Sequence, residues 1–123
     1  MNSHKRVLIA DDEPNILLSL EFLMRKKGFD VFIARNGSEA MEIIKKQKLD
    51  VAVLDIMMPD IDGYQICKYI KENKAYANCK VLFLSAKSKE ADIEKGFATG
   101  ADAYVTKPFS TRDLMQRVLD LCQ

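Results

Sequence analysis

The sequence predicts an α/β protein: a doubly wound three-layer sandwich in which five helices cover a five-stranded parallel sheet of order 2-1-3-4-5. Two observations lead to this prediction. Short apolar runs alternate strictly with amphipathic stretches along the 123-residue chain, which makes five β-α units. The runs are apolar at consecutive positions rather than at every second one, which is typical of parallel strands buried on both faces. The strands are expected at residues 7–10, 31–34, 51–54, 81–84 and 103–105.

The first two helices have clear start and stop signals. Pro14 suits the first turn of a helix, where its missing N–H does no harm. Apolar residues then recur at helical spacing until Gly28, which favours a helix end. After the second strand, Asn36 and Glu39 have the spacing of a capping box. One helix is therefore expected on each side of the second strand.

The last three helices follow from similar patterns. Asp62 can cap the third helix, and Ser110 can cap the fifth. The fourth helix is expected at roughly residues 88–98, with Ile93 and Phe97 buried. Each of these helices follows an apolar strand, as a parallel sheet requires.

Length and composition indicate one cytoplasmic domain. The net charge is only +1, so we expect no direct binding to nucleic acid or to a membrane surface. An odd number of cysteines without a Cys-x-x-Cys pair is typical of thiols in a reducing compartment. No apolar run is long enough to cross a membrane. We expect a flexible polar tail at residues 1–4 and a folded domain at residues 5–123.

The strongest functional signal is a set of polar residues where the strands end. Strand one is followed by Asp11 and Asp12, strand three ends at Asp55, strand four ends at Ser85, and strand five is followed by Lys107. Ligands of such sheets bind at the carboxyl ends of the strands, near the point where the strand order reverses. The fold is therefore expected to gather these groups in one cleft.

Three carboxylates in one cleft repel one another and need positive charge nearby. Lys107 can supply one charge, and a divalent cation can supply the rest. Oxygen ligands favour Mg²⁺ or Mn²⁺ over zinc. Such a cation beside a hydroxyl and a lysine suits phosphoryl transfer, with an aspartate as nucleophile.

In order and spacing, these residues closely resemble the receiver domain of two-component response regulators. The resemblance extends from Val7 to about Leu121. Its motifs are the Asp11-Asp12 pair, the run Asp-Ile-Met-Met-Pro-Asp-Ile-Asp-Gly that begins at Asp55, the Ser85-Ala86 pair, and the segment from Gly100 to Phe109.

The resemblance implies roles in metal binding and phosphorylation. Asp55 resembles the phosphoacceptor, which is also a metal ligand. Asp12 resembles the direct metal ligand, and Asp11 the residue that acts through metal-bound water. Met57 occupies the position that donates a backbone carbonyl to the metal, so its side chain need not be polar.

The resemblance also implies a conformational switch. Ser85 resembles the hydroxyl that binds a phosphoryl oxygen, and Lys107 the lysine that pairs with the phosphate. Tyr104 resembles the switch residue that turns inward as Ser85 moves toward the phosphate. The Lys107–Pro108 bond is expected to be cis.

By this resemblance, the chain takes a phosphoryl group from a histidine kinase or a histidine phosphotransfer protein. It then controls an output partner through the face formed by the fourth helix, fifth strand and fifth helix. It is not expected to be an enzyme, beyond catalysing its own phosphorylation and dephosphorylation. Met57 and Lys87 flank the path of water to the phosphoryl group, and Met57 cannot orient a water, so dephosphorylation is expected to be slow.

Two other functions remain open. One is an interaction module that keeps the fold but has lost phosphorylation. The other is a phosphatase of the haloacid dehalogenase type, which uses the same chemical groups. That class normally has a second aspartate two residues after the nucleophile, where this chain has Met57.

Overall fold

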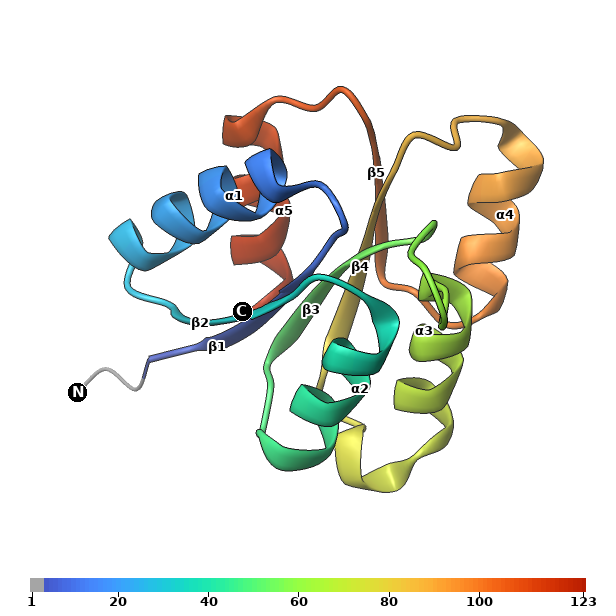
Figure 1. Ribbon diagram of the computed structural model, residues 1–123, viewed down its shortest axis with the longest axis horizontal. Helices are drawn as coiled ribbons and strands as arrows, with labels where there is room; N and C mark the ends of the chain where they lie inside the picture. Colours follow the sequence, from blue (N-terminus) through green and yellow to red (C-terminus); the bar gives the residue numbers. More distant parts are fainter. Residues whose placement is uncertain (1–3) are drawn as a thin grey trace.

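The computed structural model describes residues 4–123 (Figure 1). In this part of the chain, five parallel strands form one sheet in the order β2-β1-β3-β4-β5, which confirms the predicted order. The strands are β1 Arg6–Ala10, β2 Asp30–Ala34, β3 Val51–Asp55, β4 Lys80–Ser85 and β5 Ala103–Thr106. The expected tail at residues 1–4 lies mostly outside the described residues.

Helices cover both faces of the sheet, as expected for a doubly wound fold. They are α1 Pro14–Lys26, α2 Gly37–Lys46, α3 Gly63–Glu72, α4 Glu90–Ala98 and α5 Thr111–Leu121. Helices α1 and α5 lie on one face, and α2, α3 and α4 lie on the other (Figure 1). A short 3₁₀ helix, η1 at Lys74–Tyr76, was not predicted; it forms after Asn73, whose side chain accepts a hydrogen bond from Ala75 N. Within residues 4–123, no helix has the length and apolar character needed to span a membrane.

The predicted caps form, with one difference in detail. Asp62 and Gln65 make a reciprocal capping box at the start of α3. At α2, the Asn36 side chain accepts from Glu39 N, but the Glu39 carboxylate accepts from Arg35 N instead of closing the box on Asn36. The capping box at α2 is therefore not closed, and only its Asn36 half forms.

The sheet separates two apolar layers because successive strand residues point to opposite faces. Leu8 of β1 packs in the layer beneath α2 and α3, and Val7 packs in the layer beneath α1 and α5. Every residue of β3 is buried, since this strand lies at the centre of the sheet. The apolar character of consecutive strand residues is thus explained by burial on both sides.

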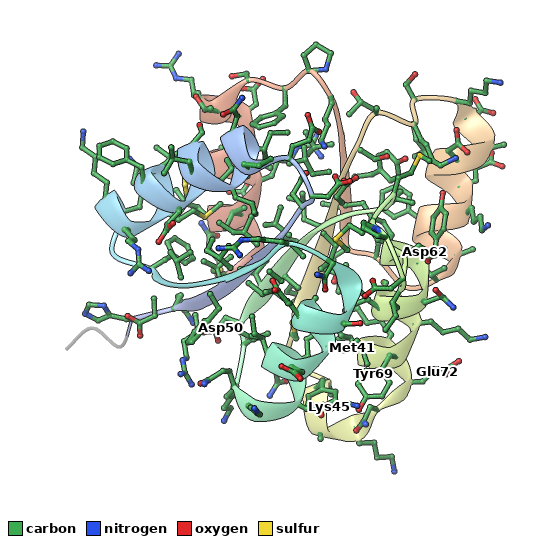
Figure 2. All side chains as sticks on the ribbon, in the orientation of Figure 1. Met41, Lys45, Asp50, Asp62, Tyr69 and Glu72 are labelled. Atoms are coloured by element: carbon green, nitrogen blue, oxygen red, sulfur yellow. The ribbon has the colours of Figure 1, made fainter. Side chains whose placement is uncertain are left out.

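Helices α2 and α3 lie side by side over one face. Lys45 of α2 places its ammonium 5.9 Å from the ring centroid of Tyr69 in α3, and both side chains are labelled in Figure 2.

In α4, Ile93 is partly buried as expected, but Phe97 is 47% exposed. The expectation that Phe97 is buried was wrong, because only a narrow strip of this edge helix faces the sheet.

Candidate functional site

The ends of the two central strands bring three carboxylates together. Strands β1 and β3 pair so that Ala10 lies opposite Leu54, and the residues that follow them are Asp11 and Asp55. Each of Asp11, Asp12 and Asp55 offers a carboxylate oxygen, and these oxygens all lie within 4.8 Å of one another. Asp11 is 1% exposed and Asp55 is 5% exposed, whereas Asp12 is open to solvent. The cluster therefore has a buried floor and an accessible side.

Burial disfavours the ionised form of the carboxyl groups in the cluster. Burial, reinforced by the charge of Asp11, raises the pKa of Asp55 to about 7, although Lys107 opposes this effect. Burial also raises the pKa of Asp11, against the hydrogen bond from Glu13 N–H and the charge of the nearby Lys107 ammonium. Both shifts indicate that the cluster has less positive charge nearby than its carboxylates need.

Lys107, which follows β5, supplies part of that charge. Its Nζ lies 3.0 Å from Asp11 Oδ2 and 3.8 Å from Asp55 Oδ2. The shortest contact, 2.6 Å, is with Glu13 Oε2. Burial alone would lower the pKa of Lys107, but its ion pairs with Glu13 and Asp11 and the charge of Asp55 raise this pKa. The lysine is thus cationic and shared among three acids.

Glu13 is a site residue that the sequence prediction missed. It directly follows the Asp11-Asp12 pair, and its backbone N–H donates to Asp11 Oδ1 at 2.9 Å. Its side chain is largely exposed, so neither periodicity nor burial marks it. The signal that could have identified it is its place beside two acids at the end of a strand.

Ser85 lies at the end of β4, next to the segment after β5 that carries Lys107. Its side chain is buried, and Ser85 Oγ accepts a hydrogen bond from Lys87 N at 3.0 Å. Its carbonyl accepts from Lys107 N at 2.8 Å, which ties the two predicted residues together through the backbone. The Lys107–Pro108 peptide bond is cis, as expected.

Tyr104 lies inward, between the sheet and α4. Its side chain is 7% exposed, and its hydroxyl donates to the Lys87 carbonyl at 2.7 Å. Burial raises the pKa of this hydroxyl, so it remains a donor at neutral pH. The centroid of its ring lies 6.1 Å from that of the Phe83 ring and 6.5 Å from that of the Phe97 ring. Ser85 and Tyr104 both bind the backbone of Lys87, Ser85 at the Lys87 N–H and Tyr104 at the Lys87 carbonyl.

Met57 follows β3 in the loop that leads to α3. Its N–H donates to Asp55 Oδ1 at 3.3 Å, which keeps this part of the loop beside the carboxylate. Its side chain is 61% exposed and lines an open groove together with Lys87.

The residues present fit a divalent cation with oxygen ligands. Asp11 Oδ2 is buried and lies near the Lys107 ammonium, yet the geometry of that ion pair leaves this oxygen without a hydrogen bond. That ammonium is shared among three acids, so the buried carboxylates remain short of positive charge, which a divalent cation would supply. Two buried carboxylates and one exposed carboxylate suit Mg²⁺ or Mn²⁺, which prefer oxygen ligands and keep several waters.

Comparison with known families gives a match over most of the chain. Residues 7–119 match the family model of the response regulator receiver domain.

Solved structures give the same picture. The receiver domain of the Francisella response regulator 1452 is 34% identical, with a TM-score of 0.89 and coverage of 97% of each chain. A putative response regulator from Chloroflexus aurantiacus J-10-fl is 32% identical, with a TM-score of 0.91 and coverage of 98% of each chain. The response regulator DrrB, described as a Thermotoga maritima OmpR/PhoB homologue, is 34% identical with a TM-score of 0.86; the match covers 94% of this chain and 51% of DrrB.

Proposed function

We propose, since this chain belongs to the response regulator receiver domain family, that it accepts a phosphoryl group on Asp55 and signals by a change of conformation. One observation supports this above all others. The buried Asp55 carboxylate lies within 4.8 Å of two further carboxylates, with the Lys107 ammonium 3.8 Å away. A nucleophilic oxygen, a cation site and a fixed positive charge are the parts that phosphoryl transfer needs.

Asp55 Oδ would attack phosphorus while the bond between phosphorus and the donor's histidine nitrogen breaks, and the electron pair of that bond stays on the ring. Asp55 must be ionised to attack. Its raised pKa of about 7 leaves a substantial protonated fraction at neutral pH, and the nearby Lys107 favours the ionised form. We assign Mg²⁺ or Mn²⁺ binding to Asp11, Asp12, Asp55 and the backbone carbonyl of Met57. When bound, the cation would neutralise charge on the phosphoryl oxygens.

The switch would follow from new hydrogen-bond partners. A phosphoryl group adds charge and acceptor oxygens beside Lys107 and the Ser85 hydroxyl. Ser85 Oγ now accepts from Lys87 N, and the Tyr104 hydroxyl donates to the Lys87 carbonyl. A move of Ser85 toward the phosphate would therefore be transmitted through Lys87 to Tyr104. Phosphorylation would shift the equilibrium between the resting and the switched conformation by the difference in the contacts that the phosphoryl group makes in each.

The partners follow from this chemistry. We propose a histidine kinase or histidine phosphotransfer protein as donor, and an output protein or domain that binds the α4–β5–α5 face. We further propose that the chain works in the cytoplasm, does not bind nucleic acid or membrane directly, and turns over only its own phosphoryl group. Its cysteines are free thiols, which is compatible with a reducing compartment.

The direct test is phosphorylation by acetyl phosphate with Mg²⁺, followed by intact-protein mass spectrometry. We expect one added phosphoryl group in the parent and none in Asp55→Asn. A pull-down with and without beryllofluoride plus Mg²⁺ would then identify the partner that recognises one state. If the folded parent gains no phosphoryl group, the interaction-only function is supported instead. Steady turnover of a small phosphate monoester would support a phosphatase.

A further inference from the structure

The loop between β3 and α3 is anchored to a helix outside the carboxylate cluster. The anchor is the side chain of Asp60, which accepts hydrogen bonds from Gly37 N at 3.0 Å and Ser38 N at 3.3 Å. It also accepts from Ser38 Oγ at 2.5 Å and from Ile61 N at 2.6 Å. Gly37 and Ser38 are the first residues of α2, so one carboxylate joins two elements that lie 22 residues or more apart in the chain.

The contact is favourable for a physical reason. The first N–H groups of a helix have no partner within the helix, and the helix dipole favours an anion there. Asn36 satisfies Glu39 N, and Asp60 satisfies the N–H groups of the two residues before it. The hydrogen bond from Ser38 Oγ, helped by those from the backbone, lowers the pKa of Asp60. Asp60 is therefore a charged cap for α2 that is supplied by a different element.

The backbone around Asp60 is tightly placed. Asp60 has a φ of 67°, a left-handed conformation that Asp tolerates better than most residues. A Cβ on Gly37 would lie 2.1 Å from the Ile61 carbonyl oxygen, so only glycine allows α2 to approach this closely. At the other end of the loop, where Asp62 starts α3 (Figure 2), a Cβ on Gly63 would lie 2.6 Å from the Asp55 carbonyl oxygen.

The loop also carries Met57, whose backbone carbonyl is the ligand that the proposed function assigns to the metal. A carboxylate can adjust to a cation by rotating its side chain, but a carbonyl ligand is placed by the backbone alone. The proposed Met57 ligand therefore depends on whatever holds residues 56–62 in position.

We propose that Asp60 is a positioning residue for the metal site: by pinning the β3–α3 loop to α2, it holds the Met57 carbonyl where the cation requires it. This inference rests on the proposed function, because it needs Met57 as a ligand. Asp60 itself need not touch the metal, since its carboxylate oxygens are engaged by α2 and by Ile61 N.

The role makes a prediction about which cation is affected. Mg²⁺ demands near-ideal octahedral geometry, whereas Ca²⁺ accepts variable geometry and ligand number. A loosened carbonyl should therefore weaken Mg²⁺ binding more than Ca²⁺ binding. If Asp60 only stabilised the fold, its loss would not change the ratio of the Mg²⁺ affinity to the Ca²⁺ affinity.

The test is isothermal titration calorimetry of the full chain with Mg²⁺ and, separately, with Ca²⁺, without phosphodonor. Asp60→Gly removes the carboxylate while a glycine accepts the positive φ. We expect Mg²⁺ affinity to fall roughly tenfold, the low end for groups that orient metal ligands, with a smaller loss for Ca²⁺. Asp60→Asn, which tolerates the same backbone and keeps one acceptor oxygen, should fall between the parent and Asp60→Gly.

Asn36→Ala is the matched control, because it removes the other cap of α2 and leaves the β3–α3 loop untouched. It should leave both affinities unchanged. Ser38→Ala, which deletes one hydrogen bond to Asp60, provides a milder second variant should Asp60→Gly fail to fold, and it should also lower the affinity for Mg²⁺ more than for Ca²⁺.

Parent-like Mg²⁺ affinity in the folded Asp60 variants, or in Ser38→Ala if they do not fold, overturns the positioning role and leaves the proposed function standing. An equal loss in Asn36→Ala overturns it too, because it would reflect the stability of α2. If the parent binds no Mg²⁺, the metal site of the proposed function fails as well.

Discussion

Replacing Asp55 by asparagine should stabilise the metal-free protein, although it removes the proposed phosphoacceptor. The pKa of Asp55 is raised from 3.8 to about 7, chiefly by burial and then by the charge of Asp11. In the unfolded chain this carboxyl loses its proton near pH 4. Between these values the unfolded state binds fewer protons than the folded state, so stability falls as the pH rises.

The magnitude follows from the size of the shift. At ~1.4 kcal/mol per pH unit, the change from 3.8 to about 7 corresponds to about 4 kcal/mol above neutral pH. At pH 5 only about 2 kcal/mol of this cost is present, because the Asp55 carboxyl is still protonated in most of the folded molecules. Asparagine resembles the protonated carboxyl in shape, and its side-chain oxygen can keep the hydrogen bond from Met57 N. The advantage of Asp55→Asn should therefore grow as the pH rises from 5 to 8.

The assay is urea unfolding of parent and Asp55→Asn in EDTA at several pH values, followed by circular dichroism. The same series in saturating Mg²⁺ is the internal control. A cation that binds the parent cluster should reduce or reverse the advantage of the variant. A stability difference that stays constant with pH, or a less stable variant at pH 8 in EDTA, would refute the reasoning about Asp55.

Three further predictions concern the chemistry and the switch. Met57→Asn introduces a side chain that can orient water, so we expect a shorter phosphoryl lifetime; an unchanged or longer lifetime contradicts this. Glu13→Gln removes the acid 2.6 Å from Lys107 Nζ and should speed phosphorylation by acetyl phosphate about two- to fivefold, the range for an exposed ion pair; a slower rate would show that Glu13 supports the reaction. Gly96→Ala places a Cβ 3.0 Å from the inward Tyr104 ring. Because the proposed switched state has Tyr104 inward, this crowding should weaken the binding of beryllofluoride, measured by titration calorimetry. Tighter binding would show that the ring does not need this space.

The fold was predictable because its signals are local. Consecutive apolar residues identified the strands, and the cap at Asp62 formed as expected. Strand order followed from a general rule about doubly wound sheets, and the pairing of β1 with β3 confirmed it. With the order known, the meeting of Asp11 and Asp55 required no further information, since both stand at the ends of adjacent strands.

Other features were not predictable because they depend on contacts between distant segments. The position of Glu13 beside two acids marks it only as a candidate site residue; that it forms the shortest contact of Lys107, 94 residues away, depends on the folded chain. Asp60 follows Pro59 in a loop, and no residue close to it in the sequence indicates that its carboxylate caps α2. The exposure of Phe97 likewise depends on how α4 is rotated against the edge of the sheet.

By itself, then, the amino-acid sequence determined the alternation of strands and helices, the sheet order, and which polar groups stand at the strand ends. The alternation and the strand-end residues depend on periodicity and on neighbours within a few residues, and the sheet order follows from that alternation by the general rule for doubly wound sheets. Only the tertiary structure decided how the charges of the cluster are shared, that the Asp55 carboxyl is buried enough to raise its pKa, and that the β3–α3 loop is pinned to α2. Burial and hydrogen bonding across tens of residues are properties of the packed chain, because they depend on which surfaces exclude water together.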